Sequence, residues 1–437
     1  MFKSLPVVAR LLSLSILAGL LAGAAVSLYV LATQALSFML FFGRESTQIS
    51  SLSPWYLYAV PTVAILVVNR LIEKEPSVRE YGVTEIAEAV GGNKAFITLR
   101  GLLLKIVASV LSLASGFSVG NEGPSAAIGA MIAYQLNRFI EVPERFVRLI
   151  LSIGASSGIA AVFVSPVTGI VFAVENIAHE FVQRLIGPIV LGSLIAFSVA
   201  VQFLDPLIFR YSIGRALHYE YMLATLLFVP VILVFLFIYL TLKDTVFNAL
   251  NRWTLKYLER WRNLLFALIG GVSIGTLLVY APFAAFSGHE VVASLINDSL
   301  DIPLTLIVGI VLLRIVGTTI SLYANAVGGL FLPLMSIGAL VGYGYAEVLA
   351  SLHLDIEPYS FAAIGAAVFM GVVMRLPLTA IVLALEITYD YNIVVPTGIA
   401  VVLASYVANL NFNIRKLTAT NIRIQVEEKE CVHAKKS

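Results

Sequence analysis

The chain has 437 residues, of which 59% are apolar and only 12% are charged, about half the charged share of a typical soluble protein. Because so few charged residues cannot cover a water-exposed surface, the composition indicates an integral membrane protein. It argues against a secreted disulfide scaffold, a disordered chain and a nucleic-acid-binding protein, since the net charge is only +2. The single cysteine, Cys431, stands in the polar C-terminal stretch, so we expect no intrachain disulfide and no thiolate metal cluster.

Apolar stretches long enough to cross a membrane recur along the whole chain. The first follows Lys3 and Arg10 like the core of a signal peptide, but it runs from Leu11 to about Phe42 and is interpreted as a membrane helix. Further spanning stretches are expected at 54–71, 101–119, 146–164, 185–204, 219–241, 264–283, 303–322, 361–374 and 393–410. Shorter pieces with Gly and Pro, interpreted as half-length or broken helices, lie at 82–92, 124–140, 166–180, 289–298, 330–350 and 377–390. Segment 242–263 is amphipathic, basic and aromatic, and we expect it at the membrane interface.

An internal repeat organises these stretches. Pro124 begins PSAAIGA, and Pro333, 209 residues later, begins PLMSIGA. Pro166 begins PVTGIVFAVEN, and Pro377, 211 residues later, begins PLTAIVLALEI, each preceded at twelve residues by a Gly-Ala pair. The chain is therefore predicted to consist of two homologous halves, 10–205 and 216–410, in one transmembrane domain (1–420) followed by a polar tail (421–437). The halves are inverted if each crosses the membrane an odd number of times. Paired broken segments of this kind point to a transporter's binding site.

The first repeated motif is preceded by a carboxylate between two glycines, in Gly120-Asn121-Glu122-Gly123-Pro124. We expect Pro124 at the first position of a helix, whose N-terminus carries partial positive charge and favours anions. The second half repeats the glycine-rich turn, without a carboxylate, in Gly328–Pro333 (GGLFLP). Two such helix starts would form an anion site without a buried lysine or arginine. Glu122 would compete with the anion and leave when protonated; the alternative is a carboxylate that only caps a helix.

Several motifs together resemble the CLC family of chloride channels and chloride/proton antiporters. Gly120–Pro124 resembles the family's G-[K/R]-E-G-P motif, and Gly328–Pro333 is similar to its G-x-F-x-P motif. Met374–Thr388 resembles its R-x-P-L-T-x-I-V-x-x-x-E-x-T helix, and Gly82–Glu85 stands where the family has G-[I/V]-P-E. The resemblance extends over about residues 10–410.

The resemblance implies an all-α integral membrane protein with a CLC-like fold of two inverted repeats containing broken, tilted helices. It implies that Glu122 is the external gating and proton-carrying glutamate. The backbone N–H groups of Gly123, Leu330 and Phe331 would line the anion path. It also implies a homodimer with a separate pore in each subunit.

This sequence departs from the family's motifs at the anion site. Asn121 replaces the basic residue of G-[K/R]-E-G-P, so one positive charge near the anion is missing. Tyr81, directly before Gly82, replaces the family's pore-lining serine, and its phenol could still donate to an anion. The family's central tyrosine has no clear counterpart, since only Asn413 stands near its place. Tyr81, Gly82 and Asn121 therefore remain candidates for anion binding.

The position of the family's internal proton-relay glutamate is also altered. It follows another glutamate in the family, and the corresponding pair here is Glu175-Asn176. Asn176 cannot carry a proton, so proton transfer would need another route, for example through Glu175. Otherwise the protein is a passive channel, or it belongs to the fluoride-exporting branch, which has G-N-E-G-P and no internal glutamate.

The sequence thus predicts a chloride/proton antiporter of the cell membrane, crossing it several times, with a small halide and the proton as partners. A passive chloride channel and a fluoride/proton antiporter are the alternatives. A cation-coupled organic-solute transporter would need more intramembrane carboxylates. We expect no enzymatic activity, no cofactor and no metal site, because the chain has no nucleophile–base motif, no P-loop and no H-E-x-x-H.

Overall fold

A computed structural model describes residues 6–43, 46–79, 98–177, 182–205, 219–257, 262–297, 302–354 and 356–411. Within these ranges the regular elements are helices. The long helices are α1 (Val7–Leu40), α3 (Pro54–Lys74), α5 (Leu99–Ala114), α6 (Glu122–Ile140), α7 (Val147–Phe163), α9 (Val182–Ala200), α10 (Tyr219–Tyr257), α11 (Arg262–Tyr280), α13 (Leu304–Tyr323), α14 (Phe331–Ser351), α15 (Pro358–Met374) and α17 (Val394–Asn411). The shorter ones are α2 (Ser46–Ile49), α8 (Pro166–Asn176), α12 (His289–Ile296) and α16 (Pro377–Thr388). The all-α prediction is confirmed.

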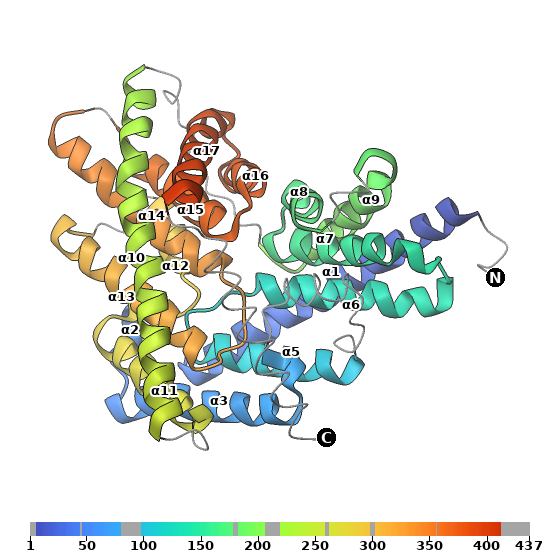
Figure 1. Cartoon of the computed structure of the whole chain (residues 1–437), viewed down its shortest axis with the longest axis horizontal. Helices are drawn as coiled ribbons and strands as arrows, with labels where there is room; N and C mark the ends of the chain where they lie inside the picture. Colours follow the sequence, from blue (N-terminus) through green and yellow to red (C-terminus); the bar gives the residue numbers. More distant parts are fainter. Residues whose placement is uncertain are drawn as a thin grey trace.

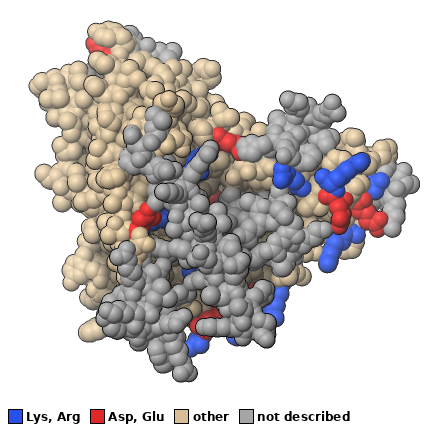
Figure 2. Space-filling model, in the orientation of Figure 1, with Lys and Arg blue, Asp and Glu red and all other residues tan. Residues whose placement is uncertain are grey.

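Each predicted spanning stretch forms a helix, and eight helices in the described ranges are long and apolar enough to cross a membrane. The predicted segment 82–92 and the tail 421–437 lie outside the described residues. Figure 2 shows a broad surface at the left of the view almost free of charge, while charged side chains are seen mostly at the right and along the bottom. Apolar side chains on such a surface face lipid rather than water. The chain is a multi-pass integral membrane protein.

Two expectations about individual segments were wrong. Segment 124–140 is not a half-length or broken helix, because α6 is continuous over 19 residues. Segment 330–350 is not one either, because α14 is continuous over 21 residues. Its glycines do not break it because they are contact points: a Cβ added to Gly338 would overlap the carbonyl of Gly365 in α15, and one added to Gly342 would overlap that of Phe361. Segment 242–263 continues α10 as far as Tyr257, and its place at the membrane interface stays a prediction.

The two halves pack alike, which the repeat predicted. In the first half, a Cβ added to Gly129 of α6 would overlap the carbonyl of Gly154 in α7. Gly338 of α14 and Gly365 of α15 make the same contact in the second half, 209 and 211 residues further on. The glycine pairs let both helix pairs approach closely. In Figure 1 the first half, blue to green, lies mostly at the right, and the helices of the second half, yellow to red, at the left.

The halves meet through two short helices that cap each other. Glu386, near the end of α16, accepts hydrogen bonds from the N–H groups of Val167 (3.0 Å) and Thr168 (2.6 Å), at the start of α8. The hydroxyls of Ser165 and Thr168 also donate to it.

The same contact is made in the other direction. Glu175, near the end of α8, accepts from the N–H groups of Leu378 (2.9 Å) and Thr379 (2.8 Å), at the start of α16, and from the Thr379 hydroxyl. Each helix start therefore lies beside the other's end, so α8 and α16 are antiparallel. Figure 1 shows the two helices next to each other. Equivalent helices that run in opposite directions are what inverted repeats require.

Candidate functional site

The two glycine-rich turns, one from each half, lie side by side and are paired through their backbones. The Gly120 N–H donates to the Gly329 carbonyl at 2.7 Å, and the Gly329 N–H donates to the Gly120 carbonyl at 2.6 Å. A side chain larger than that of glycine would disturb the site at either position. A Cβ on Gly120 would overlap the Glu122 carboxylate, and one on Gly329 would lie 2.8 Å from both Glu122 Oε2 and the Gly123 nitrogen.

Serines from the preceding helices fix both turns from the opposite half. Ser112 of α5 accepts a hydrogen bond from the Val327 N–H at 3.0 Å, and Ser321 of α13 accepts one from the Ser118 N–H at 2.9 Å. The two acceptors are 209 residues apart, and so are the two donors. The two turns are therefore held by equivalent hydrogen bonds from equivalent serines.

Both helices after the turns begin two residues earlier than predicted. Pro124 and Pro333 are the third residues of α6 and α14 rather than the first. Proline is tolerated there because the first N–H groups of a helix have no intrahelical acceptor. The earlier start places Glu122 and Phe331 as first residues, so their N–H groups are free of the helical ladder. The partial positive charge of each helix start therefore falls at the paired turns.

Glu122 is fully buried between these turns. Neither oxygen of its carboxylate has a hydrogen-bond partner in the described structure, and the amide oxygen of Asn121 is likewise unpartnered. Backbone N–H groups of Glu122 and Leu332 face the carboxylate without reaching hydrogen-bond geometry. A side chain that only capped the helix would accept such a bond. An ionisable group buried in a membrane protein without a partner usually has a function.

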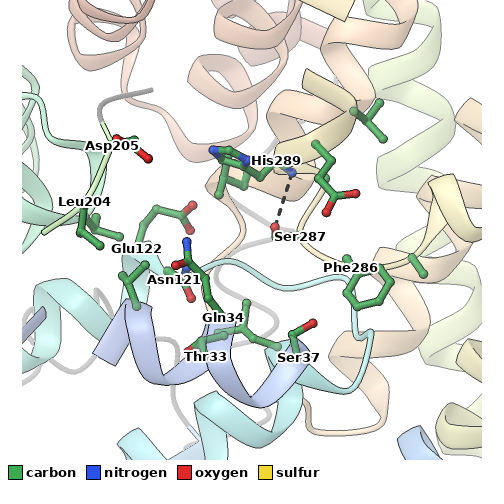
Figure 3. A pocket seen from close by; sticks show the side chains of 18 of the residues that line it. Thr33, Gln34, Ser37, Asn121, Glu122, Leu204, Asp205, Phe286, Ser287 and His289 are labelled. Atoms are coloured by element: carbon green, nitrogen blue, oxygen red, sulfur yellow. Dashed lines mark hydrogen bonds between the residues drawn. The ribbon is translucent and has the colours of Figure 1, made fainter. Parts of the chain in front are cut away.

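The carboxylate borders a pocket of about 510 Å³. Figure 3 shows Asn121 and Glu122 on one side of it, Thr33, Gln34 and Ser37 of α1 below them, and His289 opposite. Asp205 and Glu290 also line the pocket, as do Leu332 and the loop from Pro282 to Gly288. The pocket reaches the residues around Glu122, whose carboxylate oxygens are themselves covered.

The structure brings together most of the predicted anion-site residues. Asn121, Glu122 and Gly123 are at the start of α6, and Leu330 and Phe331 at the start of α14. The Phe331 ring is buried against Phe163 and Phe172, with ring centroids 6.1 and 5.9 Å apart. Tyr81 and Gly82 lie outside the described residues.

The relay position is on a different element from the paired turns. Glu175 and Asn176 are the last two residues of α8 and are half-buried. The Glu175 carboxylate is held by the start of α16, with three donors at 2.6–2.9 Å.

The sequence predicted that Glu386 caps or bonds a neighbouring helix, but it did not reveal three other features: the supporting serines, the return cap by Glu175 and the buried Arg314. The serine supports and the exchange of caps between Glu175 and Glu386 follow the repeat, with separations of 209 and 211 residues. Arg314, buried in α13, stands 209 residues after Lys105, which is buried in α5. Extending the repeat comparison from motifs to single polar residues in apolar helices would have found all three.

Comparisons with known proteins agree with this architecture. Residues 60–409 match the family model described as voltage gated chloride channel. The H(+)/Cl(−) exchange transporter ClcA of Vibrio cholerae is 30% identical over 339 residues, which cover 74% of this chain and 69% of the relative. ClcA of Vibrio parahaemolyticus is 29% identical over 383 residues, covering 83% and 79%.

Two solved structures share the fold. A slow cyanobacterial Cl⁻/H⁺ antiporter superposes with a TM-score of 0.79 at 20% identity, over 94% of this chain and 99% of the other. A CLC-type fluoride/proton antiporter gives 0.74 at 21% identity, over 91% and 95%. With the family model matched over most of its length, this chain belongs to the voltage-gated chloride channel (CLC) family.

Proposed function

We propose that this protein exchanges chloride for protons across the membrane. The observation that carries the proposal is the Glu122 carboxylate, buried and unpartnered at the point where two helix starts converge. Positive helix ends favour an anion there, and a carboxylate is the anion that the chain itself supplies. The names of the ClcA relatives support the same activity.

In this mechanism the ionised Glu122 side chain occupies the anion's place. Chloride entering from the pocket competes with it for the same positive helix ends. Protonation removes the charge of the carboxylate, so the side chain leaves and the anion takes its position. Glu122, which binds the proton, moves between two environments each time chloride replaces its carboxylate. This movement couples the chloride flux to the proton flux.

The anion path in this proposal runs along backbone donors of both halves. The N–H groups of Gly123, Leu330 and Phe331 belong to first-turn or preceding residues and are not needed by the helical ladder. Tyr81, Gly82 and Asn121 remain proposed contributors, Tyr81 through its hydroxyl.

The Glu175-Asn176 pair bears on the proton's route on the other side. Glu175 is the ionisable member of the Glu175-Asn176 pair, but its carboxylate caps α16. This engagement favours the passive chloride channel as a second candidate function.

A fluoride/proton antiporter is a third candidate. Asn121 in place of a basic residue and Asn176 in place of a glutamate support it, and so does the structural likeness to an antiporter of that type. We further propose a homodimer in the cell membrane that acts as a transporter rather than an enzyme, with the single domain 1–420 formed by repeats 10–205 and 216–410.

The experiment is flux from liposomes that contain the purified protein and are loaded with chloride or with fluoride, with anion efflux and external pH recorded together. We expect a chloride gradient to drive protons uphill. Chloride efflux without proton movement would make the protein a channel. Coupled fluoride flux with little chloride flux would establish the fluoride antiporter.

A further inference from the structure

The outer part of the Glu122 pocket is acidic, and the mechanism above does not explain why. Asp205, His289 and Glu290 line the pocket and are exposed, whereas Glu122, which also lines it, is fully buried. The described residues that line the pocket include no lysine and no arginine. A pocket that served only to gather anions would be lined by positive charge, because opposite charges draw an ion inwards and like charges repel it. The charges of this pocket therefore suit a proton rather than a halide.

His289 is held at the pocket by a fixed loop. It is the first residue of α12 and directly follows the loop 282–288. The guanidinium of the fully buried Arg314 donates hydrogen bonds at 2.7–3.2 Å to three carbonyls of this loop, those of Phe283, Ala285 and Phe286. Gly288 has a φ of +89°, and a Cβ added to it would overlap the Arg314 side chain. The loop is therefore pinned from inside the protein, and Figure 3 shows His289 across the pocket from Glu122.

His289 is the described residue of this lining that titrates near neutral pH. The ordinary pKa of an imidazole is about 6.5, whereas carboxylates ordinarily titrate near pH 4. The charged groups around it are Glu290 on the same helix, Asp205 after α9, Glu122 on α6, and Arg314 behind Gly288. The other described elements, including α14 and α15 that pack against α12, add no charged side chain to the pocket. His289 is thus the group there that both takes up and releases a proton near neutral pH.

Glu122 needs a proton donor in or beside the pocket. Both of its carboxylate oxygens are covered in the described structure, so the surrounding solution does not protonate them directly. In the proposed exchange chloride displaces the carboxylate, which then receives its proton at the pocket that Glu122 lines. The pocket volume of about 510 Å³ is enough for several water molecules, each of which takes up about 30 Å³. Such water passes a proton between two groups that do not touch.

We propose that His289 delivers protons to Glu122 from the solution on the pocket side. The imidazolium gives up one N–H proton, which pocket water passes to the carboxylate, so the products are a neutral imidazole and a carboxylic acid. The imidazole then takes its next proton from the solution, and only N–H and O–H bonds break and form. The negative charges of Asp205 and Glu290 raise the proton concentration around the imidazole. The proposal rests on proton coupling through Glu122, which is the proposed function.

The test measures coupled chloride and proton turnover of His289→Asn, in the full chain reconstituted in liposomes at neutral pH. Asparagine is polar but carries no proton, and we expect the variant to fold because the side chain is exposed. Turnover should fall roughly tenfold, less than the loss of a general acid usually costs, because pocket water offers a slower route. Free histidine added on both sides of the membrane supplies the same imidazole and should restore most of the turnover. His353→Asn is the matched control, because that histidine is exposed and does not line the pocket.

The Glu122→Gln variant separates proton delivery from the shape of the pocket. Its chloride flux needs no protonation, so adding His289→Asn should leave that flux unchanged. If His289→Asn instead slows chloride equally in both backgrounds and free histidine restores nothing, His289 only shapes the anion's path and the proposal is overturned. Unchanged coupled turnover in His289→Asn also overturns it. If His289→Asn does not yield folded protein, His289→Gln, which is closer in size, is held to the same outcomes. Absence of proton-coupled anion flux in the native protein would instead refute the proposed function itself.

Discussion

The exchange of carboxylates between α8 and α16 yields a quantitative prediction. Glu386 receives two backbone N–H groups and two hydroxyls, and Glu175 receives two N–H groups and one hydroxyl. Replacing either glutamate by glutamine keeps the shape but removes the charge and turns one acceptor into a donor that faces other donors. A hydrogen bond to a charged group contributes about 1.5–3 kcal/mol when buried, but both carboxylates are only half-buried. We therefore expect each variant to lose about 2 kcal/mol of stability.

The double variant tests whether the two caps act independently. They lie at opposite ends of α8, an 11-residue helix of about 16 Å. At that separation the two effects should add, to about 4 kcal/mol. The assay is thermal unfolding in detergent, where each single variant should lower the midpoint by about 2 °C and the double variant by twice as much. Glu73→Gln is the control, because that carboxylate is exposed and paired only with Arg70 on α3.

The reasoning is refuted if either single variant unfolds within about 1 °C of the native protein. A large loss in one variant with none in the other would show that the contacts are not equivalent. Glu175→Gln also bears on transport. If Glu175→Gln unfolds at a lower temperature than the native protein but keeps proton coupling, Glu175 is a structural cap and not the proton relay.

Three further predictions concern the paired turns and the helix contacts. Gly120→Ala places a methyl group where the Glu122 carboxylate lies, so it should displace the gate and raise chloride flux at neutral pH in liposomes; unchanged flux would contradict the assigned position of the carboxylate. Gly338→Leu forces α14 away from Gly365 and should cost at least about 3 kcal/mol in thermal unfolding, whereas Gly309→Leu should be near neutral because no described atom lies within 4 Å of its added Cβ. Chloride flux should rise as the pH falls, because protonation releases Glu122 from the anion's place. Glu122→Gln should remove this pH dependence of the flux. If the variant kept the native pH profile, a group other than Glu122 would be responsible for it.

Much of this fold could be predicted from hydropathy and the repeat. Every spanning stretch became a helix because about 20 apolar residues in a membrane have no other way to satisfy their backbone. The prediction that segment 330–350 is half-length or broken was wrong, because glycines that allow a close helix contact have the same sequence signature as glycines that end a helix. Only the partner helix, which presents the Gly365 carbonyl, distinguishes the two.

The site was predicted less completely, for a similar reason. Glu122 stood out because a carboxylate between glycines in an apolar stretch is conspicuous in one segment alone. Arg314 is defined by carbonyls 28–31 residues earlier in the chain, and Glu386 by donors about 220 residues earlier. Such long-range contacts leave no local pattern, so their only trace in the sequence is the constant separation between the two halves.

The most direct test of the central claim compares native protein with Glu122→Gln in liposomes under a chloride gradient, following chloride and pH together. Glutamine has nearly the same shape but cannot be ionised, so it neither competes as a charge nor carries a proton. We predict uphill proton movement in the native protein, and chloride flux without any coupled proton movement in the variant. Proton movement that survives in Glu122→Gln would contradict the assignment of Glu122 as the group that couples the two ions.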